Sequence, residues 1–219
     1  MPLSIPSLSD LRHRDWIVLL LTLFLVVSAI DPHDFLTFVL EVAWVVAAIA
    51  LWPFWLRRLP ATRVLFTLLV LHAVILIIGG IYTYERVPFG IVVQEWLGRP
   101  RNDYDRLGHF MQGFAPALLW REVFLRNEIV RGRAWLFVIV NGMCLAFAAA
   151  FELIEFAVAM VLGEASWAYL GQQGDVWDAQ WDMLLCAIGT NAALLTLAPL
   201  QDRAMSAMST TAATRLTRP

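Results

Sequence analysis

Long apolar runs separated by short polar stretches make up most of the chain. Most of these runs approach the ~20 residues that a helix needs to cross the hydrocarbon core of a bilayer. The first run is shorter, but D-P-H-D follows it in place of a small-residue cleavage site, which argues against a signal peptide. The pattern predicts an all-α, polytopic transmembrane helix bundle of about six spans, at residues 16–30, 35–55, 64–82, 107–125, 134–162 and 179–200.

The remaining stretches are less apolar. Residues 83–104 contain prolines and glycines around the amphipathic sequence I-V-V-Q-E-W-L, which favours an interfacial helix followed by a loop. The tail is rich in Ser, Thr and Ala and has little to pack, so we expect it to be disordered. The expected organisation is an N-terminal segment (1–15), a six-span domain (16–200) and a disordered tail (201–219).

Composition agrees with a membrane protein, and the charges predict its orientation. The chain is 60% hydrophobic and 16% charged, whereas soluble domains average nearer half apolar and about a quarter charged. All 16 basic residues are arginine, and about 12 of them fall in the N-terminal segment, the second and fourth loops and the tail. The positive-inside rule therefore places both termini in the cytoplasm. Cys144 and Cys186 lie inside apolar runs and indicate neither a disulfide framework nor a cysteine zinc site.

Three pairs of ionisable residues lie in or beside the last three predicted spans. Each pair is three or four residues apart, so its members share one face of a helix. In the expected topology all three pairs lie near the outer membrane face, and ionisable residues at such depth are functional candidates. We therefore expect them to meet at one outward-facing site, formed by Asp105 and His109, Glu152 and Glu155, and Asp178 and Asp182.

Carboxylates crowded together in a low dielectric repel one another unless a cation neutralises them. The candidate cations are Arg106, protonated His109 and a bound metal ion. Oxygen-rich ligation with one imidazole suits Mg²⁺, Mn²⁺ or Ca²⁺, with Zn²⁺ or iron less favoured. The expected metal ligands are all six paired residues, and the candidate catalytic residues are His109, Asp105 and Glu155, with His109 or a neighbouring carboxylate as general base.

Structural roles remain open for several of these residues. Asp103 and Asp178 are each placed to be the N-cap of a helix, which needs only a side-chain oxygen near the helix start. Asp175 is equally consistent with a plain loop residue. Glu41 stands alone in its predicted span and is a candidate contact to the same bundle. His109 is also consistent with a hydrogen-bonded packing residue.

Three stretches of the chain resemble a known family: Y-D-R-L-G-H-F, F-E-L-I-E and G-D-V-W-D-A-Q-W-D-M. They are similar to the hallmark stretches of the YjdF family of bacterial inner-membrane proteins, and the resemblance covers roughly residues 15–200. It implies a multi-pass fold and a location in the bacterial inner membrane more than a chemistry.

A looser likeness exists to VanZ-like membrane proteins, which are associated with glycopeptide tolerance. Their pattern is an Asp and a His four apart, a Glu and a Gln three apart, and an Asp followed by Asn and Gly. Asp105 and His109 match the first element, and Glu152 matches the second with Glu155 in place of Gln. Asp182 and Gly189 match the third element, with Cys186 where Asn would stand.

Two function classes follow. The first is a metal-dependent enzyme that acts at the outer leaflet on a lipid or lipid-linked headgroup, by hydrolysis or phosphoryl transfer. The alternative is a non-enzymatic small carrier, or a binder of cell-envelope lipid intermediates, which uses the same residues for proton or cation binding. The expected partners are membrane lipid and a lipid-linked substrate. No basic face suited to nucleic acid is present in the sequence.

Overall fold

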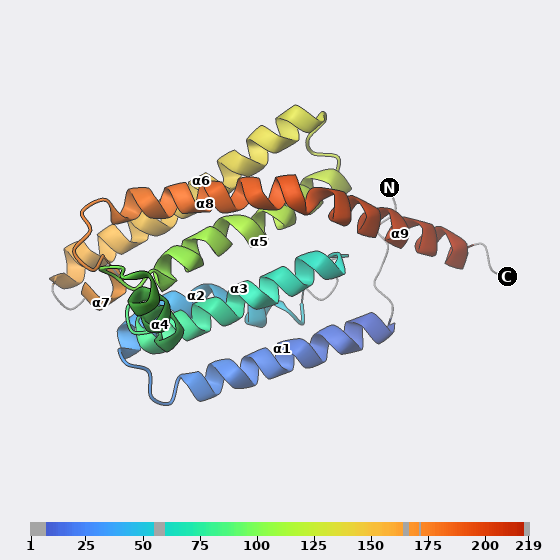
Figure 1. The fold of residues 1–219 in the computed structure, drawn as a ribbon. Coiled ribbons are helices and arrows are strands. Elements are labelled where there is room, and N and C mark those ends of the chain that lie inside the picture. The colour runs from blue at the N-terminus through green and yellow to red at the C-terminus, as the bar shows by residue number, and fades with distance from the viewer. Residues whose placement is uncertain (1–7, 55–59, 164–166, 171, 217–219) are drawn as a thin grey trace.

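The computed structural model describes residues 8–54, 60–163, 167–170 and 172–216. All regular secondary structure in this part of the chain is helical (Figure 1). The prediction of an all-α fold is thereby confirmed. The helices are α1 (Leu8–Ser28), α2 (Phe35–Leu51), α3 (Arg63–Tyr82), α4 (Pro88–Leu97), α5 (Tyr104–Arg126), α6 (Arg133–Leu162), α7 (Trp167–Leu170), α8 (Asp178–Thr196) and α9 (Ala198–Leu216).

Each apolar run of the sequence contains one of the longer helices. Among the described residues, α3 and α6 are long and apolar enough to cross a membrane. A third span results if α8 and the start of α9, which are bent by 55° at the break between them, are taken together. Helix α2 is apolar but shorter, and charged residues lower the hydropathy of α1 and α5. Length and composition of the helices thus give two or three candidate spans.

Two glycines allow α5 and α8 to approach closely. A Cβ at Gly113 of α5 would overlap the carbonyl oxygen of Cys186, and a Cβ at Gly189 of α8 would overlap the carbonyl oxygen of Phe110. Small residues at such a contact are typical of helix pairs in membranes. The contact fixes the N-terminal half of α5 beside the start of α8, and this determines where the ionisable pairs lie.

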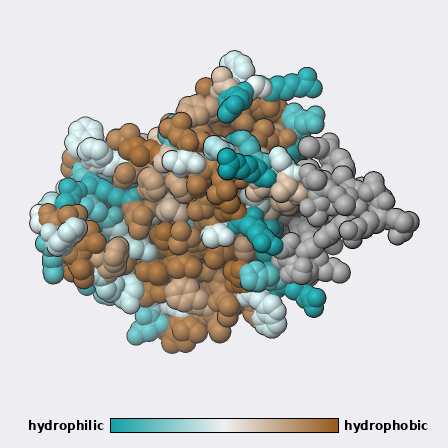
Figure 2. Space-filling model, turned by 45° about the vertical axis from the view of Figure 1, so that its right-hand side comes forward, coloured by the Kyte–Doolittle hydropathy of each residue, from teal (hydrophilic) through white to brown (hydrophobic). Residues whose placement is uncertain are grey.

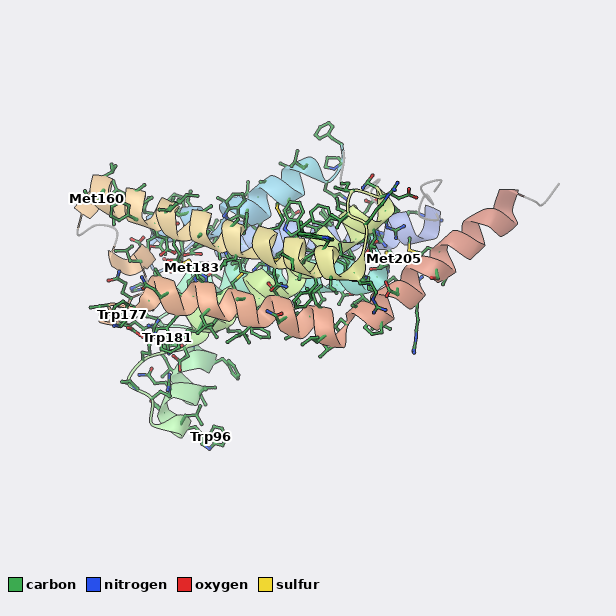
Figure 3. All side chains as sticks on the ribbon, turned by 90° about the horizontal axis from the view of Figure 1, so that it is seen from above. Trp96, Met160, Trp177, Trp181, Met183 and Met205 are labelled. Carbon is green, nitrogen blue, oxygen red and sulfur yellow. The ribbon has the colours of Figure 1, made fainter. Side chains whose placement is uncertain are left out.

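The buried apolar residues form two main clusters. One joins α5, α6 and α8 with α3 around Leu118, Val140 and Ala193. The other joins α1, α2 and α3 around Val42 and Ile77. The long helices that form these clusters run roughly alongside one another. Helix α4 projects from one end of the bundle, with Trp96 directed away from it (Figures 1 and 3). Trp96 is 82% exposed, in agreement with an amphipathic helix at an interface.

The outer surface of the bundle is strongly apolar. Figure 2 shows a broad hydrophobic band on one face, with hydrophilic residues toward both ends of the molecule. Large apolar side chains remain exposed on several helices, among them Leu20, Trp135 and Leu195. Exposed apolar area of this extent is far beyond what a soluble monomer presents, and lipid is the medium that would cover it.

The tail differs from the expectation of disorder. Residues from Gln201 onward continue α9, and Gln201 itself is fully buried. The cause lies in α5: Arg121 donates to the Gln201 side-chain oxygen at 2.8 Å and to Asp202 at 2.6 Å. A buried arginine requires such acceptors, and α9 supplies them. The N-terminal segment is also partly ordered, since α1 already begins at Leu8.

Candidate metal and acid–base site

The N-terminal turns of α5 carry two ionisable side chains on one face. Asp105 and His109 are about one turn apart, and His109 Nε2 lies 3.5 Å from Asp105 Oδ1. The other ring nitrogen, Nδ1, lies 3.0 Å from the Gln112 side-chain oxygen. Because this amide oxygen can only accept a hydrogen bond, Nδ1 donates to it. Nε2 is directed at the Asp105 carboxylate, and it is the ring nitrogen that is available to a metal ion once deprotonated.

Helices α6 and α8 each add a carboxyl group to this pair. Glu152 Oε1 lies 3.8 Å from His109 Nδ1, and Asp182 Oδ2 lies 3.9 Å from His109 Nε2. One ligand atom each from Asp105, His109 and Asp182 lies within 4.8 Å of the others. We refer to Asp105, His109, Glu152 and Asp182 as the acid–histidine cluster. It draws on the three helices that the sequence predicted would contribute.

The cluster is buried, and two of its oxygens have no hydrogen-bond partner. Asp182 is 2% exposed and His109 is 6% exposed. Among the described residues, no donor reaches Asp182 Oδ1 or Glu152 Oε1. An unsatisfied buried polar atom costs roughly 1–3 kcal/mol, and more when it is charged. Three carboxyl groups, two of which have unpaired oxygens, together with one imidazole fit the oxygen-rich ligation of a hard divalent cation.

A buried arginine, Arg101, lies beside the cluster. Its Nη1 donates to Asp178 Oδ1 at 2.5 Å, and its Nη2 lies 3.9 Å from Asp105 Oδ2. Burial disfavours the guanidinium charge, but the hydrogen bond and the attraction of Asp178 outweigh it and raise the pKa of Arg101 above its ordinary value. Asp178, one of the expected metal ligands and a candidate N-cap, therefore serves as the partner of Arg101.

The charges at the rim of the site pair with one another. Arg106, which the sequence offered as a counter-ion for the cluster, lies 3.1 Å from Asp103 and 3.0 Å from Asp175. Asp103 occupies the N-cap position of α5 but its side chain makes no capping hydrogen bond. The Arg106 guanidinium also lies 5.7 Å from the centre of the Trp181 ring. Figure 3 shows Trp177 and Trp181 at this same end of the molecule, opposite Met205.

Two further carboxyls lie around the cluster. Glu155, about one turn beyond Glu152, interacts electrostatically with Glu152 and Asp105 but is not part of the three-residue ligand set. Glu41 of α2 is 4% exposed, shares a hydrogen bond with the Tyr84 hydroxyl, and interacts electrostatically with Asp105. Glu41 was the isolated acid of the second predicted span, and the structure brings it to the site.

Three contributors were not singled out by sequence reasoning: Arg101, Gln112 and Tyr84. Gln112 stands one turn after His109 on the same face of α5, and this spacing was the available signal. Arg101 stands four residues before Asp105, but it precedes the helix, where side-chain direction does not follow from helical periodicity. Tyr84 follows a residue in the left-handed region, Thr83 with φ 57°, and this turn directs the chain back toward the bundle.

The cluster lies at one end of a cavity of about 360 Å³ that is lined by α1, α2, α3, α5 and α6 and is partly open to the surface. Its walls are mostly apolar, most of its polar lining lies near the cluster, and Arg14 lies at the other end. His72 of α3 is part of this lining, and its Nε2 is buried without a hydrogen-bond partner among the described residues.

Comparison with known proteins agrees with the geometry of a membrane bundle. A family described as predicted membrane protein (DUF2238) matches residues 14–203. The inner membrane protein YjdF of Escherichia coli (strain K12) is 45% identical over 185 residues, which is 84% of this chain and 88% of that protein. No solved structure matches the chain. The chain belongs to this family of predicted membrane proteins, and it is an integral inner-membrane protein related to YjdF.

Proposed function

We propose that the protein is a metal-dependent membrane enzyme that acts on a lipid or lipid-linked headgroup. In this proposal Asp105, His109 and Asp182 hold a divalent cation, and Glu152 is a fourth ligand or the general base. The bundle has six spans with both termini in the cytoplasm, so the site faces the outer side of the inner membrane. The reaction is hydrolysis or phosphoryl transfer at the headgroup.

One observation carries this proposal: two of the carboxyl groups that surround the His109 imidazole each have a buried oxygen without a donor among the described residues. Asp182 Oδ1 and Glu152 Oε1 are these oxygens, and Gln112 directs the imidazole by accepting from Nδ1. A hydrogen bond to the non-ligating ring nitrogen is the usual outer-shell support of a metal-bound histidine. Buried polar groups in a site built only for packing are as a rule hydrogen-bonded, so the two oxygens call for an explanation.

The roles divide by position. A divalent ion at Asp105, His109 and Asp182 would polarise a headgroup phosphate oxygen and acidify a bound water. Glu152 lies within reach of the same space and can accept the proton of that water. Arg101, charged and 5% exposed, offers a fixed positive charge to an anionic headgroup while it keeps Asp178 in place. Glu155, which interacts electrostatically with Glu152, is assigned the relay of that proton in this proposal.

Metal content is the decisive measurement. Protein purified under metal-replete conditions and then desalted is expected to carry a stoichiometric divalent ion by elemental analysis. Asp182→Asn and Asp105→Asn should each remove it, whereas Asp103→Asn, at the rim, should retain it. Mg²⁺, Mn²⁺, Ca²⁺ and Zn²⁺ are offered separately, since the ligand set admits each. A wild-type protein that binds none of the four would overturn the proposal.

A second candidate function is a carrier or binder that titrates these groups without chemistry. His72 favours it, because its ring lines the same cavity as His109 and Glu41 and its Nε2 has no hydrogen-bond partner among the described residues. Vesicles of mixed inner-membrane phospholipids distinguish the two functions. An enzyme releases a water-soluble headgroup in a metal-dependent manner that Glu152→Gln abolishes, whereas a binder retains lipid without releasing product.

A further inference from the structure

The cavity below the acid–histidine cluster has the form of a site for one hydrocarbon chain. Asp105 and Leu119 of α5 both line it and are 14 residues apart, so its length along the helix is about 21 Å. This exceeds the ~15 Å that half the hydrocarbon core of a bilayer provides. A single extended acyl chain therefore fits lengthwise.

Polarity changes along this length. The end near the cluster is lined by Glu41, His72, Asp105, His109 and Gln112. Beyond Gln112 the walls of α2, α3 and α5 become apolar, with Ala48, Leu69 and Leu119 among the lining residues. Several polar groups at one end, followed by apolar walls that reach as far as Arg14, match an amphiphile whose headgroup lies at the cluster.

Specific contacts hold the helices together at the far end of the cavity. Arg14 of α1 donates to the carbonyl oxygen of Ala61 at 2.7 Å and places its guanidinium 5.1 Å from the centre of the Phe66 ring. Trp52 donates to Asp15 at 2.8 Å and packs against Phe66, with ring centres 5.7 Å apart. These contacts tie α1 to α2 and α3 around the end of the cavity that the tip of the chain would reach.

We propose that this cavity binds one acyl chain of a membrane phospholipid, with its headgroup end at the acid–histidine cluster. The proposal rests on the proposed function for what happens at the headgroup, but capture of the chain does not require the metal. The Trp44–Phe147 pair, in edge contact with ring centres 5.1 Å apart, joins α2 to α6 and forms part of the apolar wall that such a chain would contact. An apolar cavity inside a membrane protein is most readily filled by lipid chain, since water gains no partners from such walls.

The test is photo-crosslinking with phosphatidylethanolamine that carries a diazirine at the end of one acyl chain. Protein is reconstituted in vesicles with this lipid, irradiated, digested and mapped by mass spectrometry. We expect adducts at deep cavity residues such as Leu69 and Leu119. Adducts confined to lipid-facing residues such as Leu20 and Leu195 would overturn the proposal. Adducts that gather beside Asp105 would show that the chain lies in the reverse direction and would overturn its orientation.

A bulky side chain placed in the cavity as a plug tests the proposal further, and a substitution at the neighbouring residue is its matched control. Ala48→Trp fills the apolar part of the cavity and should lower the deep adducts roughly tenfold, because overpacking competes with the chain. Ala47→Trp, the neighbouring residue outside the lining, should leave them within about twofold of the wild type. Ala73→Phe is a second plug from α3, for use if the first variant does not purify as a folded protein. Equal labelling in both plugs and the control would overturn the proposal.

The two proposals fail separately. The crosslinking is repeated with protein stripped of metal by chelation and with Asp182→Asn. Deep adducts in a protein that never binds metal would support the acyl-chain site and contradict the proposed metal-dependent enzyme. Stoichiometric metal without deep adducts would support the metal site and contradict the acyl-chain site. Labelling by a free fatty acid carrying the same diazirine, without labelling by the phospholipid, would also overturn the phospholipid assignment.

Discussion

Helix α5 carries a buried polar cluster at each end, and the two clusters differ in one respect. At its C-terminal end, Glu122 accepts from the Thr62 backbone N–H at 2.9 Å and from the Thr62 hydroxyl at 2.8 Å. Arg126 donates to it at 2.8 Å and Gln201 at 3.1 Å. At the N-terminal end, the acid–histidine cluster leaves Asp182 Oδ1 and Glu152 Oε1 without donors among the described residues.

Burial does not explain this difference. Glu122 and Asp182 are each 2% exposed, and both lie where helices of the bundle meet. In the C-terminal network both carboxylate oxygens of Glu122 accept hydrogen bonds, and these bonds join α3, α5 and α9. This is expected of a group whose role is structural. In the N-terminal cluster, two carboxyl oxygens around one imidazole have no donor among the described residues. The comparison shows that polar contacts at one end of α5 hold helices together, and it supports the proposal that the other end binds a ligand.

The largest expected effect comes from breaking the satisfied network. Glu122→Ala leaves Arg126 and the Thr62 N–H without their acceptor, and removing one partner of a buried charge pair costs ~3–5 kcal/mol. Thermal unfolding in detergent should show a large loss of stability and early melting of α9. Glu122→Gln retains an acceptor and should lose much less. An unchanged unfolding temperature in Glu122→Ala would contradict the structural role of this network.

The opposite behaviour is expected at the acid–histidine cluster. Asp182→Asn removes a buried carboxyl group that has few donors, so the metal-free protein should be as stable as the wild type or more stable. What the variant should lose is stabilisation by metal, which amounts to ~2.7 kcal/mol at a concentration 100-fold above Kd. Unfolding is measured with and without Mn²⁺. If the wild type gains no stability from any divalent ion, the proposal that the N-terminal end of α5 binds a ligand is contradicted.

A third change tests whether the glycine contact positions the cluster. Gly113→Ala places a methyl group against the Cys186 carbonyl, and α5 and α8 must separate to admit it. Overpacking of this kind costs ~1–3 kcal/mol and should also move Asp182 away from His109, which lowers metal affinity. Gly142→Ala on α6 is the control, because a Cβ there meets no neighbouring atom within 4 Å. Titration with Mn²⁺ should separate the two variants, and equal affinities would contradict the positioning role.

Much of the candidate site followed from helical periodicity in the sequence. Residues three or four apart on α5 and α8 had to share a face, and the topology of three neighbouring spans predicted that their faces would meet. Arg101 and Tyr84 did not follow, because both lie where the chain leaves a helix and the direction of a side chain depends on tertiary contacts. Glu41 had no periodic partner in its own span, and only the packing of α2 against α3 brings it near Asp105.

The same reasoning explains the error at the tail. Composition from Gln201 onward favours disorder because the segment offers few apolar residues to bury. The helix is instead held by polar contacts, in which Gln201 donates to the Leu118 carbonyl at 2.8 Å and accepts from Arg121. The burial of Arg121 does not follow from the sequence, and the structure shows that α9 supplies the acceptors that this buried arginine needs.

The smallest expected effect lies at the rim, where charges are plentiful but exposed. Asp103→Asn removes the contacts with Arg99, at 2.9 Å, and with Arg106, at 3.1 Å, yet these side chains remain partly open to solvent. Exposed ion pairs contribute ~0–1 kcal/mol, so unfolding temperature, metal content and crosslinking should all stay close to wild type. A loss of metal from Asp103→Asn as large as that from Asp182→Asn would mean that the whole acidic mouth, rather than the buried cluster, retains the ion. The two ends of α5 would then differ in exposure to solvent and not in readiness for a ligand.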